Sequence, residues 1–315
     1  MRSTTDKESS RTFTSPNITL SNGMHHPQIG YGTYKVGITN QQDDDAIKII
    51  TNALCIGYRF FDCAEFYKNE SNIGNALSSV PRNELFICSK IWNKTIESGP
   101  DAMRSQCLKT LKDLRIDYLD LLLIHWPVPN KHVHAYVTLQ ELCNEGKIRG
   151  IGLSNYTIED YLELKHVLGD RLTIPPVVNQ IQISPLLYRK TTVAFFEKEN
   201  IKIQAYRPFC KGKVFTNKVI KSIAKSYGKT VSQIVGRWCI QKGFIYFPKS
   251  SSKHRMIENF DILDFALTQE DMDLLDSLMT MEDLEISRDL YRATVNKDTC
   301  FDGTFRGVNL DTTLD

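Results

Sequence analysis

The sequence lacks the features that would direct it to a membrane, to nucleic acid or to an oxidising compartment. No segment approaches the roughly 18 apolar residues of a membrane helix, and the polar start lacks the apolar core of a signal peptide. The net charge of +2 predicts no nucleic-acid or anionic-membrane partner. The eight cysteines include no C-x-x-C pair and no histidine at ligand spacing. We therefore expect a cytoplasmic protein with reduced thiols and no metal.

Three missing motifs narrow the chemistry further. There is no G-x-G-x-x-G dinucleotide fingerprint, and the loop after the first predicted strand reads Gly32-Thr33-Tyr34-Lys35 instead. There is also no G-x-x-x-x-G-K-[ST] phosphate loop and no G-x-S-x-G nucleophile motif. An open dinucleotide-binding sheet and serine-based covalent catalysis therefore have weak support. Metal-dependent hydrolysis also has weak support, because the histidines form no metal-ligand cluster.

A regular alternation of short apolar strands and amphipathic helices predicts the fold. Near-continuous apolar runs such as residues 119–124 are typical of strands that are covered on both faces, as in parallel sheets. Eight such repeats predict a (β/α)8 TIM barrel of the α/β class. The predicted strands are 29–32, 59–62, 85–90, 118–125, 148–154, 178–181, 203–206 and 245–249. The predicted helices are 44–54, 70–77, 100–114, 134–145, 158–167, 191–199, 217–227 and 231–241.

The chain divides into one barrel and two flanking segments. Residues 1–16 are expected to be a polar N-terminal tail, and residues 17–280 the catalytic barrel. The barrel segment begins with a predicted β-hairpin, because an Asn22-Gly23 pair lies between two short β-prone runs. Residues 281–315 match no pattern that we can place and are expected to form a C-terminal loop or tail over the barrel mouth.

Polar residues gather where the predicted strands end. Active sites of such barrels lie at the C-terminal ends of the strands. A lysine at one strand end is usually solvated, and a histidine after one apolar strand is usually a core residue. Their coincidence across strands favours a functional site. The polar residues at or just after strand ends are Asp62, Lys90, His125, Ser154, Asn155, Asn179, Gln180, Tyr206, Lys249 and Ser250.

Four of the residue types present suit proton transfer. Asp62 ends a strand and Tyr67 follows it five positions later, so both side chains can reach the mouth of the same strand. A tyrosine can act as general acid, and a nearby lysine such as Lys90 lowers the pKa of its phenol. Asp62 would hold Lys90 in place, and His125 would orient the substrate oxygen.

These residues lie in motifs through which the chain resembles the aldo-keto reductases. The matching stretches cover roughly residues 18–278, and they include G-Y-R-F-F-D-C-A-E-F-Y-K-N-E from Gly57, D-L-L-L-I-H-W-P from Asp120 and E-G-K-I-R-G-I-G-L-S-N-Y from Glu145. The resemblance implies that Asp62, Tyr67, Lys90 and His125 form a catalytic tetrad. Tyr67 would donate a proton while NADPH delivers hydride to the carbonyl carbon of an aldehyde or ketone.

The resemblance also implies a set of cofactor-binding residues. Tyr206 would stack on the nicotinamide, Ser154, Asn155 and Gln180 would bind its carboxamide, and Gly32 and Thr33 would line the ring. Lys249, Ser250, Ser252 and Arg255 would surround the adenosine 2′-phosphate, and Glu258 and Asn259 would lie at the adenine. Two basic residues, Lys249 and Arg255, favour NADPH over NADH. Arg207 departs from the family pattern, in which a serine follows the stacking tyrosine, and is expected to reach the pyrophosphate or to crowd it.

Substrate and assembly are less constrained. Tyr34, Trp92 and Trp126, together with Tyr67, predict an aromatic cup suited to a small apolar or semi-polar carbonyl compound. We expect a monomer or weak dimer. Two other functions stay open: a cofactor-binding regulatory or structural subunit without turnover, and an aldolase in which Lys90 forms a Schiff base.

Overall fold

Eight parallel strands form the central sheet of the computed structural model, which describes residues 12–37 and 43–297. They follow one another in chain order, and each pairs with its sequence neighbours. The strands are β3 (Gly30–Gly32), β4 (Phe60–Asp62), β5 (Phe86–Ile91), β6 (Leu121–Ile124), β7 (Ile151–Ser154), β8 (Val178–Gln182), β9 (Lys202–Tyr206) and β10 (Ile245–Tyr246).

The sheet closes on itself. Ile29, next to β3, bridges in parallel to Tyr246 of β10, and the Tyr246 N–H donates to the Gln28 carbonyl at 2.8 Å. The predicted (β/α)8 barrel is therefore confirmed. Closure leaves no open sheet edge, and it brings the C-terminal ends of all eight strands to one mouth.

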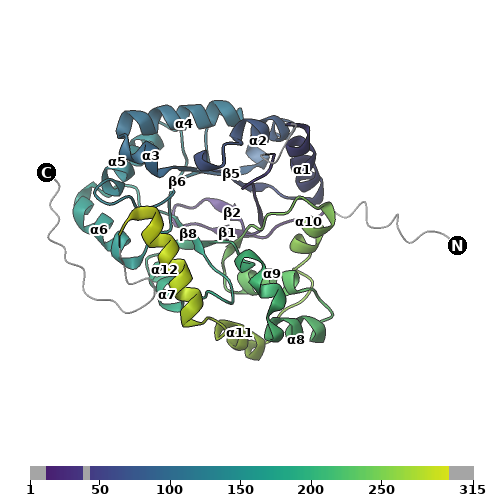
Figure 1. The fold of residues 1–315 in the computed structure, drawn as a ribbon. Helices are drawn as coiled ribbons and strands as arrows, with labels where there is room; N and C mark the ends of the chain where they lie inside the picture. The colour runs from purple at the N-terminus through teal and green to yellow at the C-terminus, as the bar shows by residue number, and fades with distance from the viewer. Residues whose placement is uncertain (1–11, 38–42, 298–315) are drawn as a thin grey trace.

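Helices surround the barrel (Figure 1). They begin where the sequence supplies starting signals: Pro100 stands at the first turn of its helix, and Thr157 and Thr230 form capping boxes with Asp160 and Gln233. The helices are α1 (Asp43–Ile56), α2 (Glu70–Leu77), α3 (Asn93–Glu97), α4 (Pro100–Leu114), α5 (His132–Asn144), α6 (Ile158–Leu168), α7 (Lys190–Lys198), α8 (Lys218–Ser226), α9 (Val231–Gln241), α10 (Lys253–Phe260), α11 (Gln269–Asp276) and α12 (Met281–Val295).

The predicted hairpin closes the bottom of the barrel. Its strands are β1 (Asn17–Thr19) and β2 (His25–Pro27), and its turn contains Gly23 with a φ of 85°. The apolar side chains inside the barrel above it include Phe60, Phe86, Leu121, Leu123 and Ile245, all fully or almost fully buried, and Leu20 of the hairpin packs against them. Just before the hairpin, Phe13 packs on Phe260 at a ring distance of 5.3 Å, so part of the expected N-terminal tail lies against the barrel.

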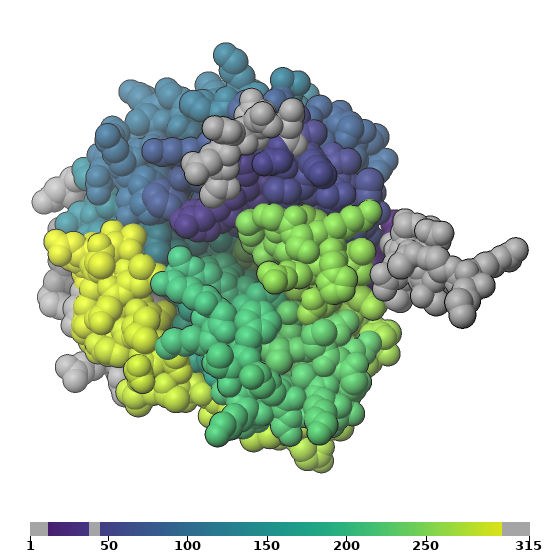
Figure 2. All heavy atoms as spheres, turned by 45° about the vertical axis from the view of Figure 1, so that its right-hand side comes forward, coloured from purple at the N-terminus to yellow at the C-terminus, as the bar shows by residue number. Residues whose placement is uncertain are grey.

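The C-terminal segment contains a helix where we expected a loop or tail. Helix α12 begins after Thr280, whose side chain accepts from the Asp283 N–H, and it runs to Val295. Tyr291 and Val295 of α12 pack against Trp126 at the mouth. In the view of Figure 2, α12 (yellow) and the loop and helices between about residues 206 and 260 (green) border a recess. The rest of that segment, residues 298–315, lies outside the described residues.

Two general findings concern the described part of the chain. None of its helices is both long and apolar enough to cross a membrane. Its seven cysteines are free thiols, while Cys300 lies outside the described residues.

Candidate active site

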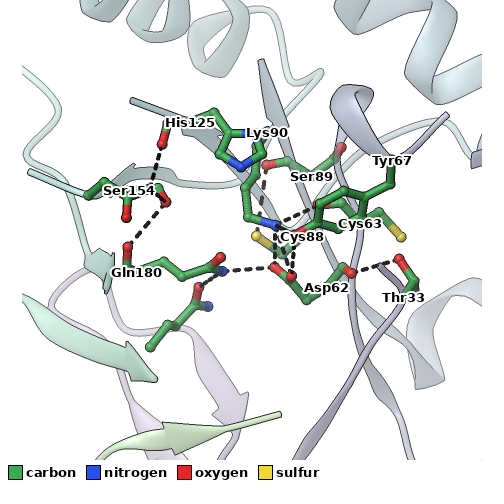
Figure 3. A network of polar contacts seen from close by, with 12 residues as sticks. Thr33, Asp62, Cys63, Tyr67, Cys88, Ser89, Lys90, His125, Ser154 and Gln180 are labelled. Carbon is green, nitrogen blue, oxygen red and sulfur yellow. Dashed lines mark hydrogen bonds and ion pairs between the residues drawn. The ribbon is translucent and has the colours of Figure 1, made fainter. Parts of the chain in front are cut away.

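The four residues of the predicted tetrad meet at the barrel mouth. Asp62 is the last residue of β4, Lys90 lies on β5, His125 follows β6, and Tyr67 ends a single 3-10 turn, η2 (Glu65–Tyr67). The Lys90 ammonium is buried and donates to Asp62 Oδ1 at 2.7 Å, to Asp62 Oδ2 at 2.8 Å and to the Cys63 carbonyl at 2.8 Å (Figure 3). Asp62 and the Cys63 carbonyl therefore hold the ammonium in one position.

The phenol of Tyr67 lies beside this ion pair. Lys90 Nζ donates to the Tyr67 oxygen at 3.2 Å, and the Tyr67 hydroxyl is 3.4 Å from Asp62 Oδ2. Burial raises the pKa of Tyr67 above its ordinary value, and Lys90 opposes that rise by attracting the phenolate. Lys90 thus acts in the predicted direction, but burial outweighs it, so Tyr67 carries its proton at neutral pH.

Lys90 keeps its charge in spite of its environment. Burial lowers the pKa of Lys90, but the attraction of Asp62, followed by that of Tyr67 and Cys88, raises it above its ordinary value overall. The site therefore holds a permanent positive charge next to the phenol oxygen.

His125 is neutral. Burial and then the nearby Lys90 charge keep the pKa of its imidazole well below the ordinary value. Its ring meets the rings of Trp92 and Tyr67 edge-on, at centroid distances of 5.0 and 6.2 Å. A neutral imidazole carries one N–H and can donate a hydrogen bond to a substrate oxygen without adding a charge.

A cavity of about 590 Å³ opens above these residues. Aromatic side chains form a large part of its wall, and they include the predicted Tyr34, Trp92 and Trp126. Phe66 also lines it, stacked on Trp92 at 4.1 Å, although we had not singled this residue out. Leu290 and Thr294 of α12 complete the wall. The cavity is of the size and character of small-molecule sites.

Polar residues of β7, β8 and β9, or directly after them, form another part of the cavity wall. Ser154, Asn155, Gln180 and Tyr206 line it together, as expected of cofactor-binding residues. They also bind one another: the Tyr206 hydroxyl donates to Asn155 Oδ1 at 2.6 Å, and Asn155 Nδ2 donates to Ser154 Oγ at 3.0 Å. Hydrogen bonds among its own side chains therefore connect the residues of this part of the wall.

Gln180 connects this wall to the tetrad. Its Nε2 donates to Asp62 Oδ1 at 2.8 Å and to Gln204 Oε1 at 2.9 Å (Figure 3). Gln204 was missed from the sequence because it lies in the middle of β9 and not at the end of a strand. Only the register, in which Gln180 and Gln204 are partners on adjacent strands, brings it to the site.

The basic end of the site lies after β10. Lys249 lines the cavity, and its Nζ donates to Ser251 Oγ at 2.9 Å. Burial, followed by the charge of Lys35, lowers the pKa of Lys249. Arg255 is exposed in the first turn of α10, where helix N–H groups favour an anion. Ser250 and Ser252 lie between these two basic residues, and the Ser252 N–H donates to Ser250 Oγ at 3.1 Å.

The remaining predicted cofactor residues differ in their distance from the cavity. Gly32 and Arg207 line it. Thr33 does not, because its buried hydroxyl donates to the Asp62 carbonyl at 2.8 Å. Glu258 and Asn259 lie on α10, one half-buried and one buried, outside the cavity wall. The position of Thr33 leaves Gly32 and Tyr34 to face the cavity from the first loop.

Within the described residues, no group of three or more His, Cys, Asp or Glu side chains is arranged to hold a metal ion. The chemistry that the side chains themselves offer is proton transfer from Tyr67.

Comparisons with known proteins agree with this geometry. The family model described as "Aldo/keto reductase family" matches residues 28–280. Glyoxal reductase of Bacillus subtilis (strain 168) is 38% identical over 256 residues, which cover 81% of this chain and 89% of that protein. Methylglyoxal reductase DkgA of Escherichia coli (strain K12) is 38% identical over 260 residues, covering 81% and 90%.

Solved structures are also similar. A mutant of Gox0644 in complex with NADPH has a TM-score of 0.78 and 32% identity, with 85% of this chain and 95% of that chain covered. An aldo-keto reductase of Bombyx mori in complex with NADP has a TM-score of 0.75 and 27% identity, with 87% and 98% covered.

Proposed function

Because the chain belongs to the aldo/keto reductase family, we propose that it reduces aldehydes, and some ketones, to alcohols with NADPH. The observation that supports this proposal best is the position of Tyr67. Its hydroxyl lies within hydrogen-bond reach of a buried, charged lysine and beside a cavity that accepts a small molecule. Relatives whose names describe reduction of glyoxal and methylglyoxal support aldehydes as the substrate class.

The residues present fit the cofactor. Tyr206 offers a ring face on the cavity wall, while Asn155 and Gln180 offer amide groups beside it. Lys249 and Arg255 supply positive charge for a 2′-phosphate, which NADPH has and NADH lacks. When bound, NADPH would supply the hydride.

The chain's own residues would handle the proton. His125 would donate an N–H to the carbonyl oxygen and so fix the carbonyl in the cavity. As negative charge develops on that oxygen, Tyr67 would pass its proton to it. The Lys90 ammonium, 3.2 Å away, would stabilise the phenolate that remains, and Asp62 would hold that ammonium in place.

The aromatic wall would set the substrate class. Tyr34, Phe66 and Trp92 present apolar ring faces, which suit a carbonyl compound with an apolar or semi-polar body. Leu290 and Thr294 would limit its length from the α12 side.

The test is NADPH consumption by the purified protein with a panel of aldehydes, ketones and sugars, repeated with NADH. We expect turnover of aldehydes that is fastest with NADPH. Absence of turnover across the panel, with NADPH still bound, would instead indicate a regulatory or structural subunit. Trapping of a covalent adduct at Lys90 by borohydride would indicate the aldolase.

The variant that tests Tyr67 as the proton donor is Tyr67→Phe. It should lower kcat by about 10²- to 10⁴-fold, the usual contribution of a general acid, because the proton donor is gone. NADPH binding, measured by calorimetry, should be unchanged. Retained activity with an ordinary pH profile would exclude Tyr67 as the donor.

A further inference from the structure

A line of buried polar side chains runs down the barrel axis from the tetrad to the hairpin. Asp62 Oδ1 accepts from Gln180 Nε2 at 2.8 Å, and Gln204 Oε1 accepts from the same nitrogen at 2.9 Å. Gln204 Nε2 then lies 3.0 Å from His26 Nε2 on β2. Finally, His26 Nδ1 lies 2.7 Å from the Pro27 carbonyl oxygen.

This line crosses an otherwise apolar barrel interior. Gln204 and His26 are both 0% exposed, and the His26 ring packs on Phe60 and Phe86 at 4.4 and 3.9 Å. Buried polar groups are costly unless each of them is hydrogen-bonded. Two such groups beneath the cavity need an explanation, since apolar residues would fill the same space.

The Pro27 carbonyl fixes the direction of every hydrogen bond in the line. A carbonyl oxygen only accepts, so His26 Nδ1 must carry the ring proton. Burial lowers the pKa of His26 from 6.5 to about 3, so the ring is neutral and its Nε2 is an acceptor. Gln204 must therefore turn its NH2 down to His26, and its Oε1 up to Gln180.

The donor and acceptor roles in this line of hydrogen bonds also determine which atom Gln180 leaves free at the cavity. Both hydrogens of its Nε2 are then used, one by Gln204 and one by Asp62. Oε1 is the remaining polar atom of the side chain, and Gln180 lines the cavity. Two acceptors, and not Asp62 alone, thus hold the amide with its oxygen available to a ligand.

We propose that His26 and Gln204 are positioning residues that fix Gln180 so that it presents a hydrogen-bond acceptor to the carboxamide NH2 of the cofactor. This inference rests on the proposed function, because it assigns a cofactor to the cavity. It gives a role in cofactor recognition to a histidine at the opposite end of the barrel.

The first test needs no ligand. Nitrogen NMR of the histidine-labelled protein distinguishes a protonated from an unprotonated ring nitrogen, and assignment uses a variant that lacks His26. We expect Nδ1 protonated and Nε2 unprotonated at neutral pH. A charged ring, or the tautomer with the proton on Nε2, would overturn the proposal whatever the variants do.

The second test compares two ligands by calorimetry: NADP and its 3-acetylpyridine analogue, in which a methyl group replaces the carboxamide NH2. The wild-type protein should bind NADP about 2- to 10-fold more tightly, the usual effect of one hydrogen bond. Gln204→Met and His26→Leu should bring that ratio towards one, because Gln180 loses its second anchor. His26→Gln should keep it, because its amide oxygen can accept from Gln204.

The control lies in the ratio itself. General loosening of the barrel would weaken both ligands equally and leave the ratio unchanged, and that result would reduce His26 and Gln204 to structural residues. Turnover of the wild-type protein distinguishes a failure of this inference from a failure of the proposed function. An active wild-type enzyme with unchanged ratios would refute this inference alone, whereas a wild-type protein that binds neither ligand would refute the proposed function.

Discussion

Lys90 shows what a single buried residue does at this site. Its ammonium has 0% side-chain exposure, and its partner Asp62 has 3%. A buried ion pair adds little net stability, but removing one partner leaves the other charge uncompensated. The pair is therefore better explained by its effect on Tyr67 than by its contribution to folding.

Replacing Lys90 by methionine should have two separable effects. The free energy of unfolding should fall by about 3–5 kcal/mol, since Asp62 stays buried without its cation. The value of kcat should fall by about 10²-fold or more, since the phenolate of Tyr67 loses its stabilising charge. Urea denaturation and steady-state kinetics measure the two.

The double variant Lys90→Met with Asp62→Asn separates the effect on stability from the effect on kcat. It removes both charges, so stability should largely return while kcat stays low. Recovery of kcat in the double variant would show that Lys90 has no role in the proton transfer.

Arg255 carries the expected choice between cofactors. Arg255→Ala should weaken NADPH binding by about 10-fold or more, the usual effect of losing a hydrogen bond to a charged group, and leave NADH binding unchanged. Lys221→Ala is the control, because Lys221 is an exposed cation on α8 and not in the segment after β10 that carries Lys249 and Arg255. Calorimetry with both cofactors gives the answer, and equal weakening of NADPH and NADH would contradict a role at the 2′-phosphate.

At the scale of elements, one buried acid contributes to the attachment of α12 to the barrel. Asp160, in the first turn of α6, accepts from the Tyr291 hydroxyl at 2.9 and 2.8 Å and from Lys297 Nζ at 2.9 Å. Asp160 also caps α6, which begins shortly after Ser154, the last residue of β7, and Asn155. One carboxylate therefore connects α12, which lines the cavity through Leu290 and Thr294, with the part of the cavity wall that contains Ser154 and Asn155.

Tyr291→Phe should loosen α12 without unfolding the barrel. Losing a buried hydrogen bond to a charged group costs about 1.5–3 kcal/mol locally, so amide hydrogen exchange in residues 281–297 should speed up by about 10-fold or more. The KM for large aldehydes should change as well, because α12 forms part of the cavity wall.

Tyr227→Phe is the matched control for that variant. The Tyr227 hydroxyl also donates to an aspartate, Asp271 at 2.7 Å, but on α11 and away from the cavity wall. Faster exchange in α12 of both variants would argue for a global loss of stability, against a local attachment.

The same elements show how far the sequence could predict the fold. Every predicted strand was found, because apolar runs between glycine and polar loops are a strong local signal. Helices α3, α10, α11 and α12 were not predicted. For α12 a signal existed, since Thr280 followed by Asp283 resembles the cap of α6, Thr157 followed by Asp160.

The site likewise contains residues that the sequence could predict and residues that it could not. Residues at strand ends, such as Asp62 and Lys90, could be predicted because a parallel barrel brings strand ends together. Gln204 and His26 could not, since their meeting depends on strand register and on how the hairpin enters the barrel. Phe66 was missed because nothing in a loop sequence says which way an aromatic side chain turns.

At the scale of the whole molecule, His26 links stability to pH. Its pKa is about 3 in the folded protein, below the ordinary 6.5, so between these values the unfolded chain binds a proton that the native ring does not. The free energy of unfolding should therefore decrease as pH falls below 6.5, by about 1.4 kcal/mol per pH unit for this group.

His26→Leu should remove that dependence. Between pH 7 and pH 5 the wild-type protein should lose about 2 kcal/mol more stability than the variant, as measured by urea denaturation at each pH. Parallel curves would show that the ring is already charged in the native state, or that it titrates freely.

The three tryptophans divide into two groups by location. Trp92 and Trp126 line the cavity, whereas Trp238 is fully buried in α9 and donates to Asp276 at 2.7 Å. Ultraviolet emission from the first two should respond when a nicotinamide or an aldehyde enters, while that from Trp238 should stay constant. The unmodified chain thus contains an optical reporter of its own occupancy.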